Sequence, residues 1–271
     1  MNSKHQNSLG KALVTGASAG IGATYADRLA RRGYDLVLVA RDQNRLQALA
    51  ERLSHETGVR VEVLKADLSS KVDLARVEQR LRDDEQITLL VNNAGISAEG
   101  SLVGGDIEAY ESMIRLNVLA VTRLIGAVAP GFVARGEGTI INISSVLALA
   151  PELFNGVYSG TKAFVLNLSQ SLQKELSEKG VRVQAVLPGA TRTELWGKTG
   201  VDVASLPPGF VMEVDEMVDA ALAGLDSGEV VTIPSLPEVK DWEEFNAARL
   251  ALAPNLSKDH AADRYRVAVN A

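Results

Sequence analysis

Tyr158 and Lys162 stand four residues apart in the segment Tyr-Ser-Gly-Thr-Lys, and Ser145 precedes Tyr158 by thirteen residues. On a helix, residues four apart share one face, so the Lys162 ammonium can lie near the Tyr158 phenol. A nearby cation favours the phenolate and lowers the tyrosine pKa from about 10, which would allow proton exchange near neutral pH. The Ser145 hydroxyl suits a carbonyl or alkoxide oxygen. These residues predict a proton-transfer site, although a tyrosine that merely packs beside a lysine gives the same spacing.

The composition argues against several classes of function. The chain has 271 residues, 46% of them hydrophobic, and a formal net charge of −6, so no basic surface for nucleic acid or an anionic membrane is visible. Because the sequence has no cysteine, it offers no disulfide, thiolate metal site or cysteine nucleophile. The three histidines have no second ligand at metal spacing and predict no metal site: His5, His55 and His260.

The N-terminus and the apolar runs bear on location. The first eight residues are polar and lack the apolar core of a signal peptide. No apolar run is both long and charge-free enough to span a bilayer. We therefore expect a soluble cytoplasmic protein.

Short β-branched runs alternate with helical stretches from near the N-terminus to about residue 233. Several runs are apolar almost throughout, as expected of parallel strands covered on both faces. The alternation predicts one α/β domain with a doubly wound, Rossmann-type parallel sheet of about seven strands flanked by helices. The predicted strands are 11–15, 35–40, 60–64, 87–91, 138–144, 181–187 and 229–233, and the predicted helices are 20–32, 42–56, 70–83, 106–135, 157–179 and 213–226.

Two stretches interrupt this alternation. The connection at about 190–212 carries Trp196, Phe210 and Met212 and is predicted to be a lid, with a plain surface loop as the alternative. Residues 234–271 form a C-terminal extension with a predicted helix at 239–252, which could pack on the domain or on a neighbouring subunit. The whole chain is thus predicted to be a single domain with a core at about 10–233.

A glycine-rich turn follows the first predicted strand. Gly16, Gly20 and Gly22 have the spacing G-x-x-x-G-x-G and lead into a helix. Glycines let the backbone approach a pyrophosphate, which the positive end of the helix attracts. The spacing differs from the standard G-x-G-x-x-G, and no Gly-Lys-Ser/Thr follows, so an ATPase or GTPase is not favoured. The alternative is an ordinary glycine-rich turn.

The end of the second predicted strand bears on the choice of nucleotide. In dinucleotide-binding folds an acidic side chain here takes the ribose 2′-hydroxyl of NAD, whereas an arginine accommodates the 2′-phosphate of NADP. The strand ends in Ala40 and is followed by Arg41 and Asp42, which favours NADP(H) over NAD(H). Asp42 could instead cap the next helix, and Arg41 could be a solvated surface residue.

Together these residues resemble the short-chain dehydrogenases/reductases in their single-domain form. The resemblance covers about residues 10–233: 15–22 resemble the T-G-x-x-x-G-I-G loop, and 92–95 the N-N-A-G turn. It implies the strand order 3-2-1-4-5-6-7, with a nucleotide beside the carboxyl ends of the strands. It assigns nucleotide contacts to Gly16, Ser18, Gly20, Ile21, Gly22, Arg41, Asp67, Leu68, Asn93, Ala94, Gly95, Tyr158, Lys162, Pro188, Gly189, Thr191 and Thr193.

The resemblance also implies a reaction. An NADP(H)-dependent oxidoreductase of this family interconverts a carbonyl and a secondary alcohol by hydride transfer, with Tyr158 as general acid or base. Lys162 would hold the nicotinamide ribose and lower the Tyr158 pKa. Ser145 would bind the substrate oxygen, and Asn117 would hold a water that links Lys162 to solvent. The implied catalytic residues are Asn117, Ser145, Tyr158 and Lys162.

The substrate is constrained only in its general character. The segment between Ser145 and Tyr158 is mostly apolar and, with Trp196, predicts a small molecule with a hydrophobic body. The same side chains could instead fill space under the lid. The predicted substrate contacts are Ser145, Leu147, Phe154 and Trp196. Because family members are commonly dimers or tetramers, we expect a homodimer or homotetramer.

Several assignments have alternatives. Asn92 is better explained as a tie between neighbouring strands than as a nucleotide contact, Asn117 could be satisfied by backbone, and Asp67 could cap a helix. An NADPH-binding sensor without turnover is the main alternative function, since fold does not fix function. A sensor has no use for a proton donor, so the Ser, Tyr and Lys set favours an enzyme. An epimerase or dehydratase usually needs a separate substrate domain, for which this chain is too short.

Overall fold

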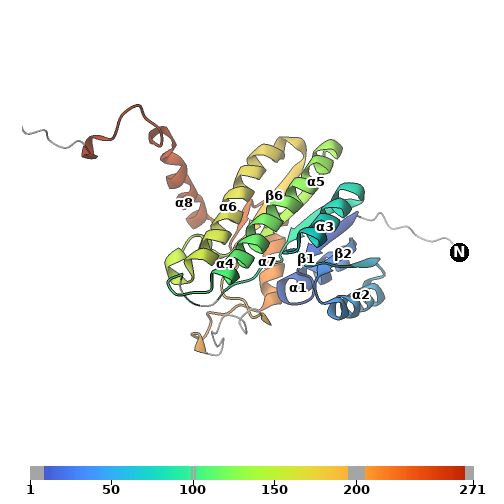
Figure 1. Cartoon of the computed structure of the whole chain (residues 1–271). Helices are drawn as coiled ribbons and strands as arrows, with labels where there is room; N and C mark the ends of the chain where they lie inside the picture. Colours follow the sequence, from blue (N-terminus) through green and yellow to red (C-terminus); the bar gives the residue numbers. More distant parts are fainter. Residues whose placement is uncertain (1–8, 99, 101, 195–204, 266–271) are drawn as a thin grey trace, which may run out of the picture. The chain divides into compact units, whose positions relative to one another are not determined.

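Seven parallel strands form the centre of the structure. The computed structural model describes residues 9–98, 100, 102–194 and 205–265, and within them the strands pair in the order β3-β2-β1-β4-β5-β6-β7 (Figure 1). The predicted doubly wound sheet and the implied strand order are confirmed. The strands are β1 Lys11–Thr15, β2 Asp35–Ala40, β3 Val61–Lys65, β4 Ile87–Asn92, β5 Gly138–Ile143, β6 Val181–Val186 and β7 Val231–Thr232.

Helices cover both faces of the sheet. They are α1 Gly20–Arg31, α2 Gln43–Thr57, α3 Lys71–Asp83, α4 Ile107–Ile114, α5 Val121–Arg135, α6 Gly156–Leu176 and α7 Val214–Asp226. In β1, Ala12 and Val14 pack in one apolar core with α1, α2 and α7, whereas Leu13 packs in a second core with α3, α5 and α6. Successive side chains of a strand point to opposite faces, so both faces must be apolar.

The predicted helix at 106–135 is interrupted. A π-helical segment, η1 at Arg115–Ala120, joins α4 to α5. By length and composition, Ile107–Arg135 is the one stretch among the described residues that could cross a membrane, whereas the sequence analysis expected no such run. Within the fold, 44% of its apolar window is buried. Core helices of soluble proteins pass the same test, so this is a weak indication of a membrane span.

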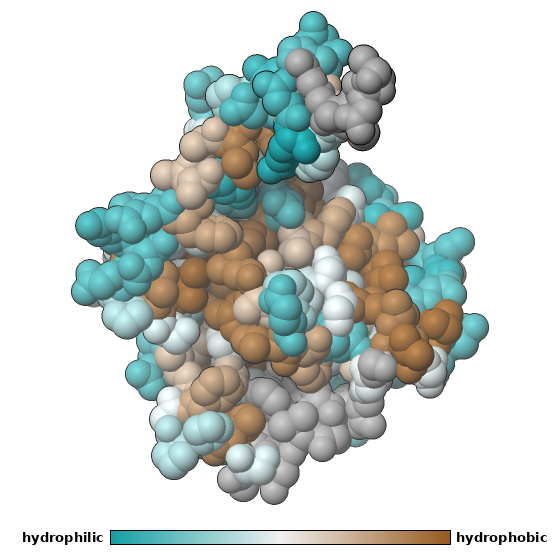
Figure 2. Space-filling view, turned by 90° about the vertical axis from the view of Figure 1, so that its left-hand side faces the viewer, coloured by the Kyte–Doolittle hydropathy of each residue, from teal (hydrophilic) through white to brown (hydrophobic). Residues whose placement is uncertain are grey.

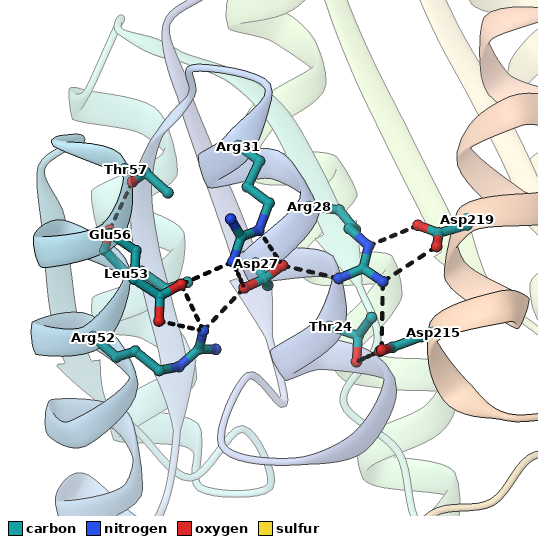
Figure 3. Close-up of polar contacts among 10 residues, drawn as sticks. All are labelled: Thr24, Asp27, Arg28, Arg31, Arg52, Leu53, Glu56, Thr57, Asp215 and Asp219. Atoms are coloured by element: carbon teal, nitrogen blue, oxygen red, sulfur yellow. Dashed lines mark hydrogen bonds and ion pairs between the residues drawn. The ribbon is translucent and has the colours of Figure 1, made fainter.

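A network of arginines and carboxylates joins α1 to α2 and α7 (Figure 3). Asp27 of α1 is buried and accepts hydrogen bonds from Arg31 at 2.9 Å and from Arg52 of α2 at 3.1 Å. Arg28 pairs with Asp219 of α7 at 2.7 Å. Burial by itself would raise the pKa of Asp27, but hydrogen bonds from Arg31, Arg28 and Arg52 outweigh it and lower the pKa to about 2.

The chain divides into two compact units, Met1–Pro234 and Ser235–Ala271. The first contains the whole sheet. The second contains α8, Val239–Ala251, where a helix was predicted at 239–252. Along this helix every residue is at least partly exposed. The interpretation of the chain as a single domain with an extension stays a prediction.

Candidate active site

The glycine-rich turn connects β1 to α1. Gly16 has a φ of 66° and Gly20 a φ of 52°, in the left-handed region that favours glycine. A Cβ at Gly22 would lie 2.3 Å from the Gly16 carbonyl oxygen, so this position admits no side chain. At Ala19, α1 begins without a side-chain cap and without an acidic residue in its first turn. Its first N–H groups and the positive end of its dipole therefore fit a pyrophosphate.

Thr15 links this turn to the loop after β4. Its buried hydroxyl donates to the Val91 carbonyl at 3.1 Å and accepts from the N–H groups of Asn93 and Ala94 at 3.0 and 3.1 Å. The Asn93 side chain donates to the Thr15 carbonyl at 2.9 Å. These bonds bring the predicted nucleotide contacts of the two loops together. Thr15 was missing from the predicted site, although it opens the T-G-x-x-x-G motif.

Asn117 lies in the π-helical segment η1 and is buried. Its Oδ1 accepts from the Ile96 N–H at 2.9 Å, and its Nδ2 donates to the Ile96 carbonyl at 2.9 Å and to Thr161 Oγ1 at 3.2 Å. The side chain is thus satisfied largely by backbone, as the structural alternative expected. A Cβ at Gly95 would lie 3.2 Å from Asn117 Oδ1 and 3.6 Å from Lys162 Nζ, so these residues adjoin one another. π-helical turns recur at functional sites.

Ser145, Tyr158 and Lys162 lie together where β5 ends and α6 begins. Lys162 is buried, and its Nζ donates to the Ile143 carbonyl at 3.0 Å and lies 5.6 Å from the centre of the Tyr158 ring. Ser145 makes a hydrogen bond with the Tyr158 side chain. The Ser144 hydroxyl donates to the Lys162 carbonyl at 2.7 Å, which fixes α6 against the end of β5. The structure therefore brings the predicted proton-transfer residues together.

The pKa values differ from the expectation. Burial lowers the pKa of Lys162 to about 8. Burial raises the pKa of Tyr158 to about 12, although the hydrogen bond with Ser145 acts in the opposite direction. The predicted lowering of the Tyr158 pKa by Lys162 is wrong for this arrangement, because removal of the phenolate from water dominates. The phenol carries its proton at neutral pH.

The residues assigned to the adenosine half follow β2 and β3. Arg41 is exposed just after β2, and Asp42 caps α2 by accepting from the Arg45 N–H at 3.0 Å, which confirms its alternative role. Asp67 accepts from the Ser69 N–H and hydroxyl at 2.9 and 2.6 Å. Burial alone would raise the Asp67 pKa, but the Ser69 bonds and the charge of Arg41 outweigh it and lower that pKa. Because the N-cap of α3 is Ser70, the alternative of Asp67 as that helix's cap is wrong.

The segment after β6 also reaches the glycine-rich turn. A Cβ at Gly20 would lie 3.2 Å from the Thr193 methyl group. Thr191 donates to the Gly189 carbonyl at 3.1 Å, and the Pro188 carbonyl accepts from the Val146 N–H at 3.0 Å. The remaining assigned residues lie in the same loops: Ser18 and Ile21 are partly buried, and Leu68 is buried.

Of the predicted substrate residues, two adjoin the tyrosine and its serine partner. The Phe154 ring meets the Tyr158 ring edge-on with centroids 5.8 Å apart, and the Leu147 N–H donates to Ser145 Oγ at 3.2 Å. Trp196 and the rest of 195–204 in the predicted lid lie outside the described residues. Asn92 donates to Asn142 Oδ1 at 2.9 Å, and so ties β4 to β5 as the sequence analysis favoured.

Comparison with known proteins identifies the family. The sequence profile of the short chain dehydrogenases matches residues 10–204, more than half of the chain. The chain belongs to the short-chain dehydrogenase family. An uncharacterized oxidoreductase of Staphylococcus saprophyticus is 38% identical over 189 residues, which are 69% of this chain and 81% of that protein. This short-chain dehydrogenase is accordingly an oxidoreductase.

Two solved structures are similar over nearly the full length. A short-chain dehydrogenase from Sphingobium yanoikuyae, in complex with NADPH, is 56% identical with a TM-score of 0.92, and the match covers 95% of this chain and 100% of that one. The bulky-bulky ketone specific alcohol dehydrogenase from Comamonas testosteroni is 49% identical with a TM-score of 0.88, covering 96% and 99%. Because these matches cover 95% and 96% of this short-chain dehydrogenase, each of them includes part of the segment Ser235–Ala271.

Proposed function

We propose that this short-chain dehydrogenase uses NADPH to reduce ketones that carry two bulky apolar substituents, and catalyses the reverse oxidation of the secondary alcohols. One observation carries the proposal: Ser145, Tyr158 and Lys162 lie together at the carboxyl ends of the strands, next to the turn that fits a pyrophosphate. Ligands of open α/β sheets bind at this edge.

The described residues suit NADPH. The glycine-rich turn and the uncapped start of α1 suit its pyrophosphate, and the exposed guanidinium of Arg41 suits the 2′-phosphate. The Sphingobium relative, which is 56% identical, has NADPH in its structure. Lys162 and the Asn93–Gly95 turn, close to one another, would hold the nicotinamide half.

The chain's own residues would manage the proton. Bound NADPH supplies the hydride. Because the pKa of Tyr158 is about 12, its phenol is protonated at neutral pH and suited to donate to the substrate oxygen. Ser145, the hydrogen-bond partner of Tyr158, would donate to the same oxygen as negative charge develops there.

The surroundings of the site are apolar. Leu102, Val103 and Leu153 are exposed on the loops that follow β4 and β5. A hydrogen bond of 2.6 Å from Asn155 to the Gly100 carbonyl joins those two loops. Figure 2 shows apolar areas on the side of the molecule where α4 and α6 lie. Such side chains suit large apolar groups on a ketone, and the name of the Comamonas relative records that specificity.

The test compares wild type with Tyr158→Phe, which keeps the ring. With NADPH and a diaryl or dialkyl ketone, we expect wild-type turnover and a loss of about 10²- to 10⁴-fold in the variant, with unchanged NADPH binding. NADPH absorbance measures turnover, and fluorescence titration measures binding. A variant with near wild-type activity would overturn the role of Tyr158. Tight NADPH binding without turnover of any ketone would instead favour a sensor.

A further inference from the structure

Asn155 was not among the predicted site residues, yet both ends of its buried side chain are engaged. Its Oδ1 accepts from the Val157 and Tyr158 N–H groups at 2.9 and 3.1 Å, so it caps α6 at the turn that carries Tyr158. Asparagine is a favoured N-cap because its side chain satisfies N–H groups that the helix leaves open. The oxygen end therefore fixes the first turn of α6, and with it the backbone position of Tyr158.

The nitrogen end of Asn155 faces a different part of the chain. Its Nδ2 donates to the Gly100 carbonyl at 2.6 Å and lies 3.2 Å from the Tyr110 hydroxyl, which itself donates to the Gly100 carbonyl at 3.3 Å. Gly100 belongs to the loop that leaves β4 after the Asn93–Gly95 turn. The Asn155 side-chain amide thus joins the start of α6 to the loop that follows β4. This loop, described at 93–98, 100 and 102–106, is called the β4 loop.

The β4 loop also packs against the tyrosine itself. Ala98 is buried in a small apolar cluster with Tyr110 and Met113 of α4, and the partly buried ring of Tyr158 packs on that cluster. Beyond Gly100, this loop carries the exposed apolar residues Leu102 and Val103. A side chain that holds Gly100 therefore also holds the loop that packs on the Tyr158 ring and carries these apolar residues.

We propose that Asn155 is a positioning residue with two separable effects: its oxygen end orients Tyr158 for turnover, and its nitrogen end holds the β4 loop against the substrate. The proposal rests on the proposed function for its kinetic consequences. The contacts of the two ends are different, so the substitutions that remove them differ as well.

Two variants separate the two ends. Asn155→Asp keeps an oxygen acceptor for the α6 N–H groups, and aspartate is an equally good cap, but it cannot donate to the Gly100 carbonyl. Asn155→Ala removes both ends. Ser70→Ala, which removes the cap of α3 outside the site, is the matched control for the stability cost of a lost cap.

The contact of the Asn155 nitrogen end with the Gly100 carbonyl is called the clamp. Hydrogen exchange tests it without any turnover. In Asn155→Asp, we expect faster exchange at the amide of Ile96, which lies in the same loop and donates to Asn117 Oδ1, with the amides of Val157 and Tyr158 as protected as in wild type. In Asn155→Ala, we expect both sets to exchange faster. Ser70→Ala should change neither set. Unchanged exchange at Ile96 in Asn155→Asp would overturn the clamp.

Steady-state kinetics tests the consequence for catalysis. For Asn155→Asp, we expect KM for the ketone to rise about tenfold, the usual effect of leaving one buried hydrogen-bonding group unpaired, with kcat within about twofold. For Asn155→Ala, we expect kcat to fall by about tenfold or more as well, while the Kd for NADPH stays unchanged in both. Equal kinetics of the two variants would refute the separation. If wild type reduces no ketone, the proposed function fails, whereas hydrogen exchange still decides the clamp.

Discussion

Lys162 points its ammonium at the backbone carbonyl of Ile143, 3.0 Å away, and the same ammonium lies 5.6 Å from the centre of the Tyr158 ring. The lysine therefore fastens α6 to the end of β5 as well as placing a positive charge near the phenol. Burial lowers its pKa to about 8, so this charge is present at neutral pH and is lost in mildly alkaline solution.

The first prediction concerns the stability cost of that buried charge. Between pH about 8 and 10.5, Lys162 binds fewer protons in the folded chain than in the unfolded chain, so its contribution makes the free energy of unfolding rise with pH through that window. Lys162→Met cannot titrate and lacks this rise. We expect the free energy of unfolding of wild type, relative to the variant, to be about 2 kcal/mol larger at pH 9.5 than at pH 8. Urea unfolding at both pH values measures this, and a pH-independent difference would show that the lysine is not buried as a titrating group.

Arg41 gives a prediction about nucleotide choice. Arg41→Ala should weaken NADPH binding by about 10- to 100-fold, the range for one hydrogen bond to a charged group, and leave NADH binding unchanged. Because the side chain is exposed, added salt should reduce the difference. Titration of both nucleotides measures the effect, with Arg82→Ala of α3 as an arginine control away from β2. Unchanged NADPH affinity in Arg41→Ala would remove the 2′-phosphate assignment.

The glycine-rich turn gives a matched pair of substitutions. A Cβ at Gly22 would lie 2.3 Å from the Gly16 carbonyl and 2.5 Å from Asn93 Nδ2, so Gly22→Ala must push the two loops apart. We expect it to lose NADPH binding and about 1–3 kcal/mol of stability. A Cβ at Gly126 of α5 would meet no side chain and no other element within 4 Å, so Gly126→Ala should gain up to about 1 kcal/mol. Calorimetry with and without NADPH compares the pair; similar behaviour of both variants would contradict the crowded turn.

Asp27 gives a prediction at acid pH. Its pKa is lowered to about 2 from 3.8, so its ionised form stabilises the fold above pH 3.8, and that stabilisation is lost as the pH falls toward about 2. We expect Asp27→Asn to lose about 2 kcal/mol at pH 7 and progressively less below pH 3.8. Glu111→Gln, which breaks an exposed pair with Arg115, should cost at most about 1 kcal/mol. Urea unfolding at pH 7 and pH 3 measures both, and a pH-independent loss in Asp27→Asn would contradict the lowered pKa.

The fold was largely predictable because its signals are local. The strands 11–15 and 35–40 were predicted to the residue, since each is an apolar run bounded by glycine or polar residues. The π-helical segment Arg115–Ala120 was not predicted, because the stretch Ile107–Arg135 is so apolar that an offset of its helical faces by one residue does not show in the sequence. Residues 231–232 form a shorter strand than the predicted 229–233, since strand length depends on the pairing partner β6.

The site was predictable in its side chains and not in its backbone partners. Ser145, Tyr158 and Lys162 could be found from spacing, whereas the carbonyl of Ile143 that holds Lys162 has no signature in the sequence. The direction of the Tyr158 pKa shift was wrong because burial depends on side chains distant in the sequence. The cap at Asn155 could have been found, since an asparagine directly before a helix is a typical N-cap.

The π-helical turn has a consequence for how this region can change. An α-helix turns about 100° per residue, so one additional residue within a turn offsets the faces of α4 and α5 by roughly that angle. A single-residue deletion in 115–120 would leave a helix of ordinary appearance but rotate either Asn117 away from Ile96 or the apolar side of α5 away from the sheet. The number of residues in 115–120 therefore sets both the position of Asn117 and the packing of α5, so an engineered change of length here would disturb both at once.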